Sequence, residues 1–121
     1  MDTKIFKGRD GWRAETRIDL GMVNKKGAKL ELEIDTRKGS RGLQTYATVY
    51  AIDGYFRSHT FDMGSGRGDF SKRLEDLPGA RCTEKSIRTL HESVIGRASA
   101  ITELAKAHYA TKAEPTGIIA T

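Results

Sequence analysis

Residues 12–20 read WRAETRIDL, and apolar and polar side chains alternate along the whole segment. Such alternation indicates a β-strand with one buried face, because successive side chains of a strand point to opposite sides. Residues 29–35 (KLELEID) repeat the pattern, with leucine and isoleucine on one side and charged residues on the other. Residues 21–27 between them are rich in Gly, Asn and Lys, as loops are. The two segments predict an antiparallel hairpin with one face in water.

The next two strand-like segments, 43–52 and 55–63, are separated by Asp53-Gly54. This dipeptide is typical of a type I′ turn, in which both central residues need a positive φ. Such a turn fixes the register, so we expect Tyr50 to lie opposite Arg57. One face of this hairpin is then large and aromatic and the other is small. The aromatic face holds Tyr46, Tyr50, Ile52, Tyr55, Arg57, His59 and Phe61, and the small face holds Leu43, Thr45, Ala47, Val49, Ala51, Phe56, Ser58 and Thr60.

The apolar period changes from two to about 3.6 in the second half of the chain. Apolar residues at i, i+4 and i+7 predict a short helix over 70–77, capped by Asp69 and ended by Pro78-Gly79. Thr83 can cap a longer helix over 84–109, in which Gly96 predicts a kink or a break. The expected fold class is α+β. It consists of an antiparallel meander sheet of four to five strands, with 4–6 as a short edge strand, followed by the short and the long helix packed on one face.

Length and composition bound the kind of protein. The 121 residues suffice for a single α+β domain over 1–121, with residues 113–121 expected to be a loosely held tail. No apolar run approaches the ~20 residues of a membrane span, and the chain starts without a signal-peptide core. Cys82 is the single cysteine, which excludes an internal disulfide and fits a reducing compartment. We therefore expect a cytoplasmic protein that does not interact with membranes.

Positive charge is concentrated in the first third of the chain. Lys and Arg number 21 against 16 Asp and Glu, a net charge of +5. Residues 1–42 hold 11 of these basic and 7 of these acidic residues, so +4 of that charge lies there. Alternate loops of a meander lie at the same end of the sheet. One end should therefore gather basic residues interleaved with glycines, namely Lys7, Arg9, Arg37, Lys38, Arg41 and Arg67.

Glycine-rich basic loops of this kind suit phosphate binding, because glycine lets backbone N–H groups approach and arginine forms bidentate contacts with phosphate. Such loops are also common simply because they are solvated. Tyr46 and Tyr50 beside Arg57 would suit base stacking if exposed, or would form the core if the helices cover them. The pattern does not decide which face the helices cover. The leading prediction is a small basic protein that binds nucleic acid through Lys7, Arg9, Arg37, Lys38, Arg41, Arg67, Tyr46, Tyr50 and Arg57.

The sequence offers little for catalysis or cofactor binding. Residues 64–68 (GSGRG) lack the Gly-Lys-Ser/Thr ending of a Walker loop, and no paired-cysteine or His-x-x-x-His spacing predicts a metal site. On a helix, Cys82 and His91 would stand ~13 Å apart, too far for a nucleophile and its base. We therefore expect no enzyme activity, no metal and no cofactor.

The alternative function is protein binding. A compact α+β domain without catalytic groups also suits an inhibitor or accessory factor of the mobile-element or phage type, for example one that blocks a host defence complex. The apolar stripe within 98–110 would serve either a homodimer or the interior of the monomer.

Overall fold

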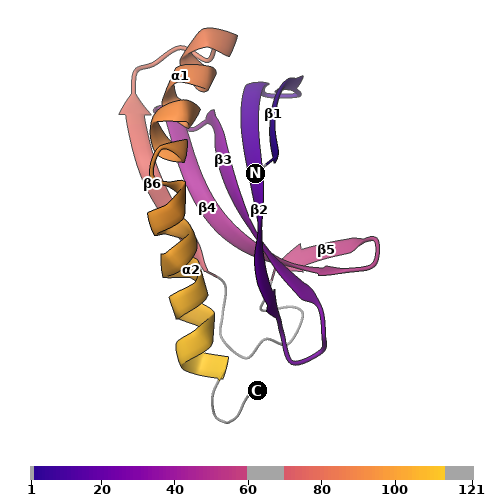
Figure 1. Ribbon diagram of the computed structural model, residues 1–121. Helices are drawn as coiled ribbons and strands as arrows, with labels where there is room; N and C mark the ends of the chain where they lie inside the picture. Colours follow the sequence, from indigo (N-terminus) through magenta and orange to yellow (C-terminus); the bar gives the residue numbers. More distant parts are fainter. Residues whose placement is uncertain (1, 60–69, 114–121) are drawn as a thin grey trace.

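The computed structural model describes residues 2–59 and 70–113, which form a curled antiparallel sheet followed by two helices (Figure 1). The strand order is β1-β2-β3-β4-β5, and β6 pairs with β4 as well. The predicted α+β fold is confirmed, including the edge strand at the start of the chain. The strands are β1 (Asp2–Gly8), β2 (Gly11–Val23), β3 (Lys29–Lys38), β4 (Gly42–Asp53), β5 (Phe56–His59) and β6 (Ser71–Pro78).

The predicted short helix over 70–77 is wrong, because this segment is strand β6. The strand pairs with the first part of β4, from Gly42 to Thr48, whereas β5 pairs only with the last part, from Tyr50 to Asp53. A bulge in β6 leaves Leu74 outside the register, and Leu74 packs against the core. A strand is favoured over a helix here because it supplies hydrogen-bond partners to backbone groups of β4 that the short β5 leaves unpaired.

The predicted register of the β4–β5 hairpin is also wrong, by two residues. Tyr50 lies opposite His59, and Ile52 lies opposite Arg57. The two loop residues are Gly54 and Tyr55, and Gly54 takes the positive φ of 62° at the first loop position, which both common hairpin turns require. A shift of two keeps the paired side chains of β4 and β5 on their predicted faces, while residues 60–63 of the predicted strand lie outside the described residues. Arg57 therefore still reaches Tyr50, with the guanidinium 3.8 Å from the ring centre.

The predicted long helix is present as two helices, α1 (Glu84–Ile95) and α2 (Ala98–Ala113), and the predicted break at Gly96 is confirmed. Thr83 is the N-cap of α1, as predicted. Its side chain accepts a hydrogen bond from the backbone N–H of Ser86, whose hydroxyl accepts in return from the Thr83 N–H. None of the described helices is long and apolar enough to cross a membrane.

The helices cover the small face of the sheet, which settles the point that the sequence left open. Ala47, Val49 and Ala51 are fully buried in one core cluster with side chains of both helices. Small side chains on β4 let the helices approach closely. The principal residues of this core are Leu20, Leu30, Leu32, Ile34, Ala47, Val49, Ala51, Phe70, Val94, Ile101, Ala105 and Tyr109.

Candidate nucleic-acid interface

Three connecting segments meet at one end of the sheet. The β1–β2 and β3–β4 turns lie there because the sheet is an antiparallel meander, as the sequence predicts. Residues 79–82, which link β6 to α1, are the third segment. The backbone N–H of Gly79 donates to the carbonyl of Arg41 over 2.7 Å, and the Cys82 thiol donates to the carbonyl of Trp12. Residues 79–82 therefore bridge the two turns.

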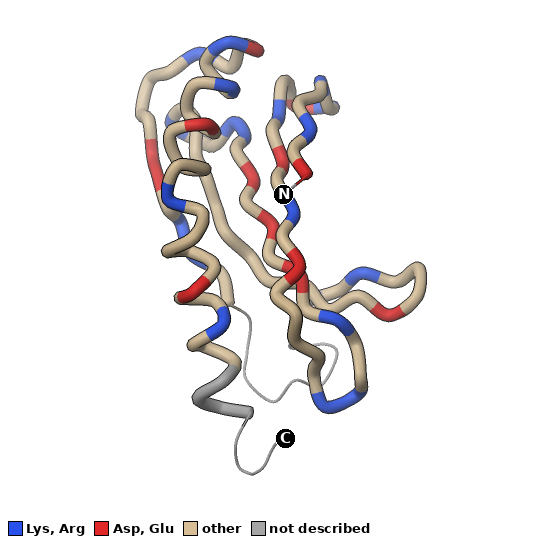
Figure 2. The backbone as a smooth tube through the Cα atoms, in the orientation of Figure 1, with Lys and Arg blue, Asp and Glu red and all other residues tan. Residues whose placement is uncertain are grey.

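This arrangement gathers cations from separate parts of the chain, as the blue segments near the top of Figure 2 show. Arg81 is placed between the two turns by the hydrogen bonds of its neighbours Gly79 and Cys82. We call these residues the basic end: Lys7, Arg9, Lys38, Arg41, Arg81 and Lys85.

The side chains of the basic end are exposed and, among the described residues, have no ion-pair partner. All six residues are exposed, and none of them forms an ion pair within residues 2–59 and 70–113. Asp10 and Glu84 are the acidic residues nearest in sequence, and Glu84 pairs with Arg88. Arg67, another predicted contact, lies outside the described residues. The basic end thus presents an excess of positive charge to solvent.

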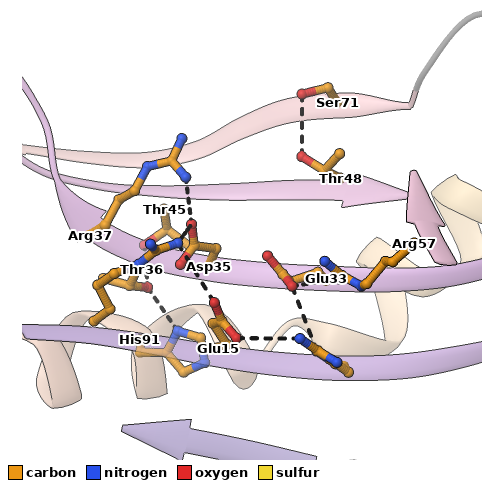
Figure 3. Close-up of polar contacts among 12 residues, drawn as sticks. Glu15, Glu33, Asp35, Thr36, Arg37, Thr45, Thr48, Arg57, Ser71 and His91 are labelled. Carbon is orange, nitrogen blue, oxygen red and sulfur yellow. Dashed lines mark hydrogen bonds and ion pairs between the residues drawn. The ribbon is translucent and has the colours of Figure 1, made fainter. Parts of the chain in front are cut away.

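Arg37 and Arg57, two further predicted contacts, lie elsewhere and are ion-paired. They belong to the sheet face opposite the helices, which we call the open face. Arg37 Nη1 is 2.7 Å from Asp35 Oδ2, and Arg57 Nη2 is 2.5 Å from Glu33 Oε1 (Figure 3). Both arginines thus already have carboxylate partners within the protein.

These two pairs are part of a larger network across β2, β3 and β5. Arg13 contacts both Asp35, at 3.1 Å, and Glu15, at 3.6 Å, and Arg17 bridges Glu15 and Glu33. Four positive and four negative side chains are joined, so their formal charges cancel. The ion-pair network consists of Arg13, Arg17, Arg37, Arg57, Glu15, Glu31, Glu33 and Asp35.

Tyr46 and Tyr50, the predicted stacking residues, are half-buried on the same face. The guanidinium of Arg37 lies 5.1 Å from the ring centre of Tyr46, and that of Arg57 lies 3.8 Å from the ring centre of Tyr50. Burial, and then the charge of Glu33, raise the pKa of Tyr50. Each ring therefore already has an arginine stacked on it, which leaves less of the ring for a base.

Three carboxylates of the network lie close enough together to hold a cation. Ligand oxygens of Glu15, Glu33 and Asp35 all lie within 4.8 Å of one another. The side chains of Glu33 and Asp35 are only 8% and 4% exposed, and burial is the main cause that raises the pKa of Glu33. The arginines that contact this cluster already neutralise it, so a divalent cation would have to displace them. The arrangement favours a structural role.

A second polar chain lies inside the protein, between the sheet and α1. The imidazole of His91 is 1% exposed and hydrogen-bonds Thr16 through Nε2 at 2.7 Å and Thr36 through Nδ1 at 2.8 Å. The hydroxyl of Thr16 also hydrogen-bonds that of Thr3, and the hydroxyl of Thr36 hydrogen-bonds that of Thr45. His91 thus links α1 to four strands, and burial lowers its pKa. Both ring nitrogens of His91 are already engaged, and the thiol of Cys82 is bonded to a carbonyl.

Arg81 and Lys85 are the candidate residues that sequence reasoning missed. The predicted helix over 70–77 concealed them, because a helix there gives no reason to place residue 81 beside residue 41. The pairing of Gly42 with Pro78 is what carries the chain back to this end. Predicting a strand over 71–78 would have found them.

The chain has no significant match among protein-family models, curated proteins or solved structures.

Proposed function

We propose that this protein binds nucleic acid, and that the basic end contacts the phosphate backbone. The observation that carries the proposal is the contrast between two sets of cations. The arginines of the open-face network are paired with carboxylates, whereas the basic end exposes Lys7, Arg9, Lys38, Arg41, Arg81 and Lys85 without an ion pair among the described residues. Cations without a protein partner gain most from phosphate, because little has to be broken when they bind.

Contacts between the exposed cations of the basic end and phosphate read the backbone of a nucleic acid rather than its bases. We therefore expect binding with little sequence preference. The glycines beside these turns serve packing instead: a Cβ at Gly11 would lie 3.0 Å from the Cys82 sulfur, and a Cβ at Gly42 would meet backbone atoms of residues 77–79.

The proposed activity is binding and not catalysis. Both ring nitrogens of His91 are hydrogen-bonded to threonines, and the Cys82 thiol donates a hydrogen bond to a backbone carbonyl. The thiol and the imidazole are therefore not paired as a nucleophile and its base.

The test is a titration of fluorescently labelled DNA and RNA, followed by anisotropy at several salt concentrations. Arg41→Ala/Arg81→Ala removes two exposed charges of the basic end and should leave the melting temperature unchanged. We expect weaker binding to all sequences alike. The log–log salt slope should fall by about two, because each arginine of the pair neutralises roughly one phosphate when it binds.

The matched control is Lys72→Ala/Lys106→Ala, which removes the same charge from exposed and half-buried positions on β6 and α2. It should change binding much less. If the wild-type protein does not bind nucleic acid at low salt, or if both double variants bind with the same reduced affinity, the proposal is wrong.

A further inference from the structure

The β4–β5 hairpin ends in two exposed aromatic residues. Tyr55 is 104% and Phe56 is 76% exposed, and the hairpin projects from the rest of the sheet (Figure 1). The other exposed large apolar residues of the described chain, Val23, Leu77 and Leu104, are aliphatic and lie on separate elements. The chain therefore exposes two neighbouring aromatic rings at one point only, within the described residues.

The turn itself does not require these aromatic residues. Gly54 supplies the positive φ that the loop needs, and Asp53 pairs with Phe56 through the backbone ladder, which any side chain permits. Rings that lie in water add almost nothing to the core. Since neither turn geometry nor packing accounts for them, a ligand is the remaining physical reason to present two ring surfaces there.

The charges of the neighbouring loop at this end of the sheet favour an anionic ligand. The loop after β2 carries Lys25 and Lys26, and it lies at the same end of the sheet because Lys29 pairs with Ile52 next to the tip. Both lysines are exposed and form no ion pair within the described parts of the chain. Asp53 is the one acidic residue of the turn itself. Lys29 is already paired with Asp19 at 3.8 Å.

We propose that Tyr55 and Phe56 stack with unpaired bases of a single-stranded nucleic acid, a proposal that rests on the proposed function. Exposed ring faces together with lysines on the neighbouring loop are features with which sequence-tolerant single-strand binders hold bases and backbone. Bases within a duplex are already stacked on each other and offer no free face. The site would make the protein prefer single strands over duplexes, which the basic end alone does not.

The two sites lie at opposite ends of β4. Gly42 begins the strand beside the basic end and Asp53 ends it beside the hairpin tip, and twelve residues of strand span at most about 40 Å. A single strand can extend over this length, and the open face along the way carries the neutral ion-pair network, which does not repel it. One strand can therefore contact both ends.

The experiment compares a labelled single strand of about 20 nucleotides with a hairpin duplex of the same composition. Tyr55→Ser/Phe56→Ser should retain the wild-type melting temperature, since both side chains are exposed. We expect its affinity for the single strand to fall about tenfold or more, with the salt slope and the affinity for the duplex unchanged. A 2-aminopurine in the single strand should change its fluorescence when wild-type protein binds and not when this variant binds.

The control is Val23→Ser/Leu104→Ser, which removes two exposed aliphatic side chains and should bind both probes as the wild type does. If Tyr55→Ser/Phe56→Ser binds the single strand normally while Arg41→Ala/Arg81→Ala does not, the hairpin proposal is wrong and the proposed function stands. If the wild-type protein binds neither probe at low salt, both proposals fail. The alternative is then that the exposed rings of the tip insert into a pocket of a partner protein.

Discussion

His91 shows most clearly how one side chain holds several elements together. It is buried, yet both of its ring nitrogens have hydroxyl partners on different strands. A neutral imidazole has one donor and one acceptor, and a threonine hydroxyl can fill either role. The neutral ring is therefore fully satisfied, and burial opposes the charged form. This explains why the pKa of His91 is lowered.

The lowered pKa predicts that the protein loses stability in mild acid. In the unfolded chain the imidazole binds a proton below about pH 6.5, whereas in the folded protein it stays neutral to lower pH. The free energy of unfolding should therefore not vary with pH on account of His91 above that value. Below it, the free energy should fall by at most about 1.4 kcal/mol per pH unit on account of His91, until the lowered pKa of the folded state is reached.

Urea unfolding between pH 4.5 and 8, at intervals of about half a unit, measures this dependence. His91→Phe is less stable at every pH, because Thr16 and Thr36 lose a partner. Subtracting its profile from that of the wild type removes the contributions of the other histidines. A difference that does not vary with pH would show that His91 is not kept neutral.

Sequence and structure agree best where each residue has one dominant preference. Alternation predicted the correct faces of β3 and β4, because the opposite face would place the apolar side chains of β3 away from the core. The expectation that the other face of β3 lies in water was wrong for Glu33 and Asp35, which are buried among the arginines of the ion-pair network. Exposure of Arg9 and Arg41 was equally predictable, because both lie in turns between strands. The pairing of Arg37 with Asp35 and of Arg57 with Glu33 was not, because an ion pair depends on register and on side-chain reach.

At the scale of elements, the two wrong predictions, the helix over 70–77 and the register of the β4–β5 hairpin, share one cause. Residues 70–77 have apolar spacing that suits a helix, and 53–54 have the composition of a two-residue turn. Both were decided by pairing between strands: β6 fills the edge of β4, and the two-residue loop starts one residue later than the Asp-Gly pair suggests. Local patterns do not contain this information for β6, since its partners, such as Gly42 for Pro78, lie in a distant part of the sequence.

At Gly42 the backbones of β4 and β6 leave no room for a Cβ, which gives a prediction at this scale. A Cβ there would lie 2.7 Å from the backbone N of Gly79 and would clash with the carbonyl of Leu77. Backbone atoms cannot turn aside as side chains do, so Gly42→Ala must displace the end of β6. We expect a loss of about 2 kcal/mol or more in the free energy of unfolding.

Gly96→Ala is the matched control, measured by the same thermal or urea unfolding. Gly96 has helical backbone angles, with φ −58° and ψ −18°, and a Cβ there would make only ordinary contacts, the nearest at 3.6 Å. This substitution should be neutral or stabilise by about 0.5 kcal/mol, because alanine has less freedom in the unfolded chain. Equal losses at both positions would contradict the close approach of β6.

For the whole molecule, the arrangement separates cations that stabilise the fold from cations that face solvent. The sheet's open face would otherwise bury Glu33 and Asp35 as uncompensated charges, and the arginines of the ion-pair network prevent this. The cations of the basic end, in contrast, compensate no carboxylate within residues 2–59 and 70–113. The net charge of +5 does not by itself show this uneven distribution of positive charge over the surface.

Arg57→Met tests this separation. Arg57 is the nearest counter-ion of Glu33, and after its removal Arg17 remains at 3.7 Å from the same carboxylate oxygen. We expect the free energy of unfolding to fall by about 2 kcal/mol or more at pH 8, because a buried carboxylate loses its main partner. Glu33 already has a raised pKa, and losing Arg57 raises it further, so protonation relieves the variant as the pH falls. The loss should therefore be smaller at pH 5 than at pH 8.

The same variant should keep the nucleic-acid affinity and the salt slope of the wild type, measured at a temperature where it is folded. Arg41→Ala/Arg81→Ala should behave in the opposite way, with weaker binding and unchanged stability. Glu33→Gln/Arg57→Met provides the internal check, because removing the buried charge together with its partner should recover part of the lost stability. If Arg57→Met instead binds nucleic acid weakly and unfolds like the wild type, Arg57 is a ligand contact. The open face would then belong to the interface, and the division between structural and solvent-facing cations would be wrong.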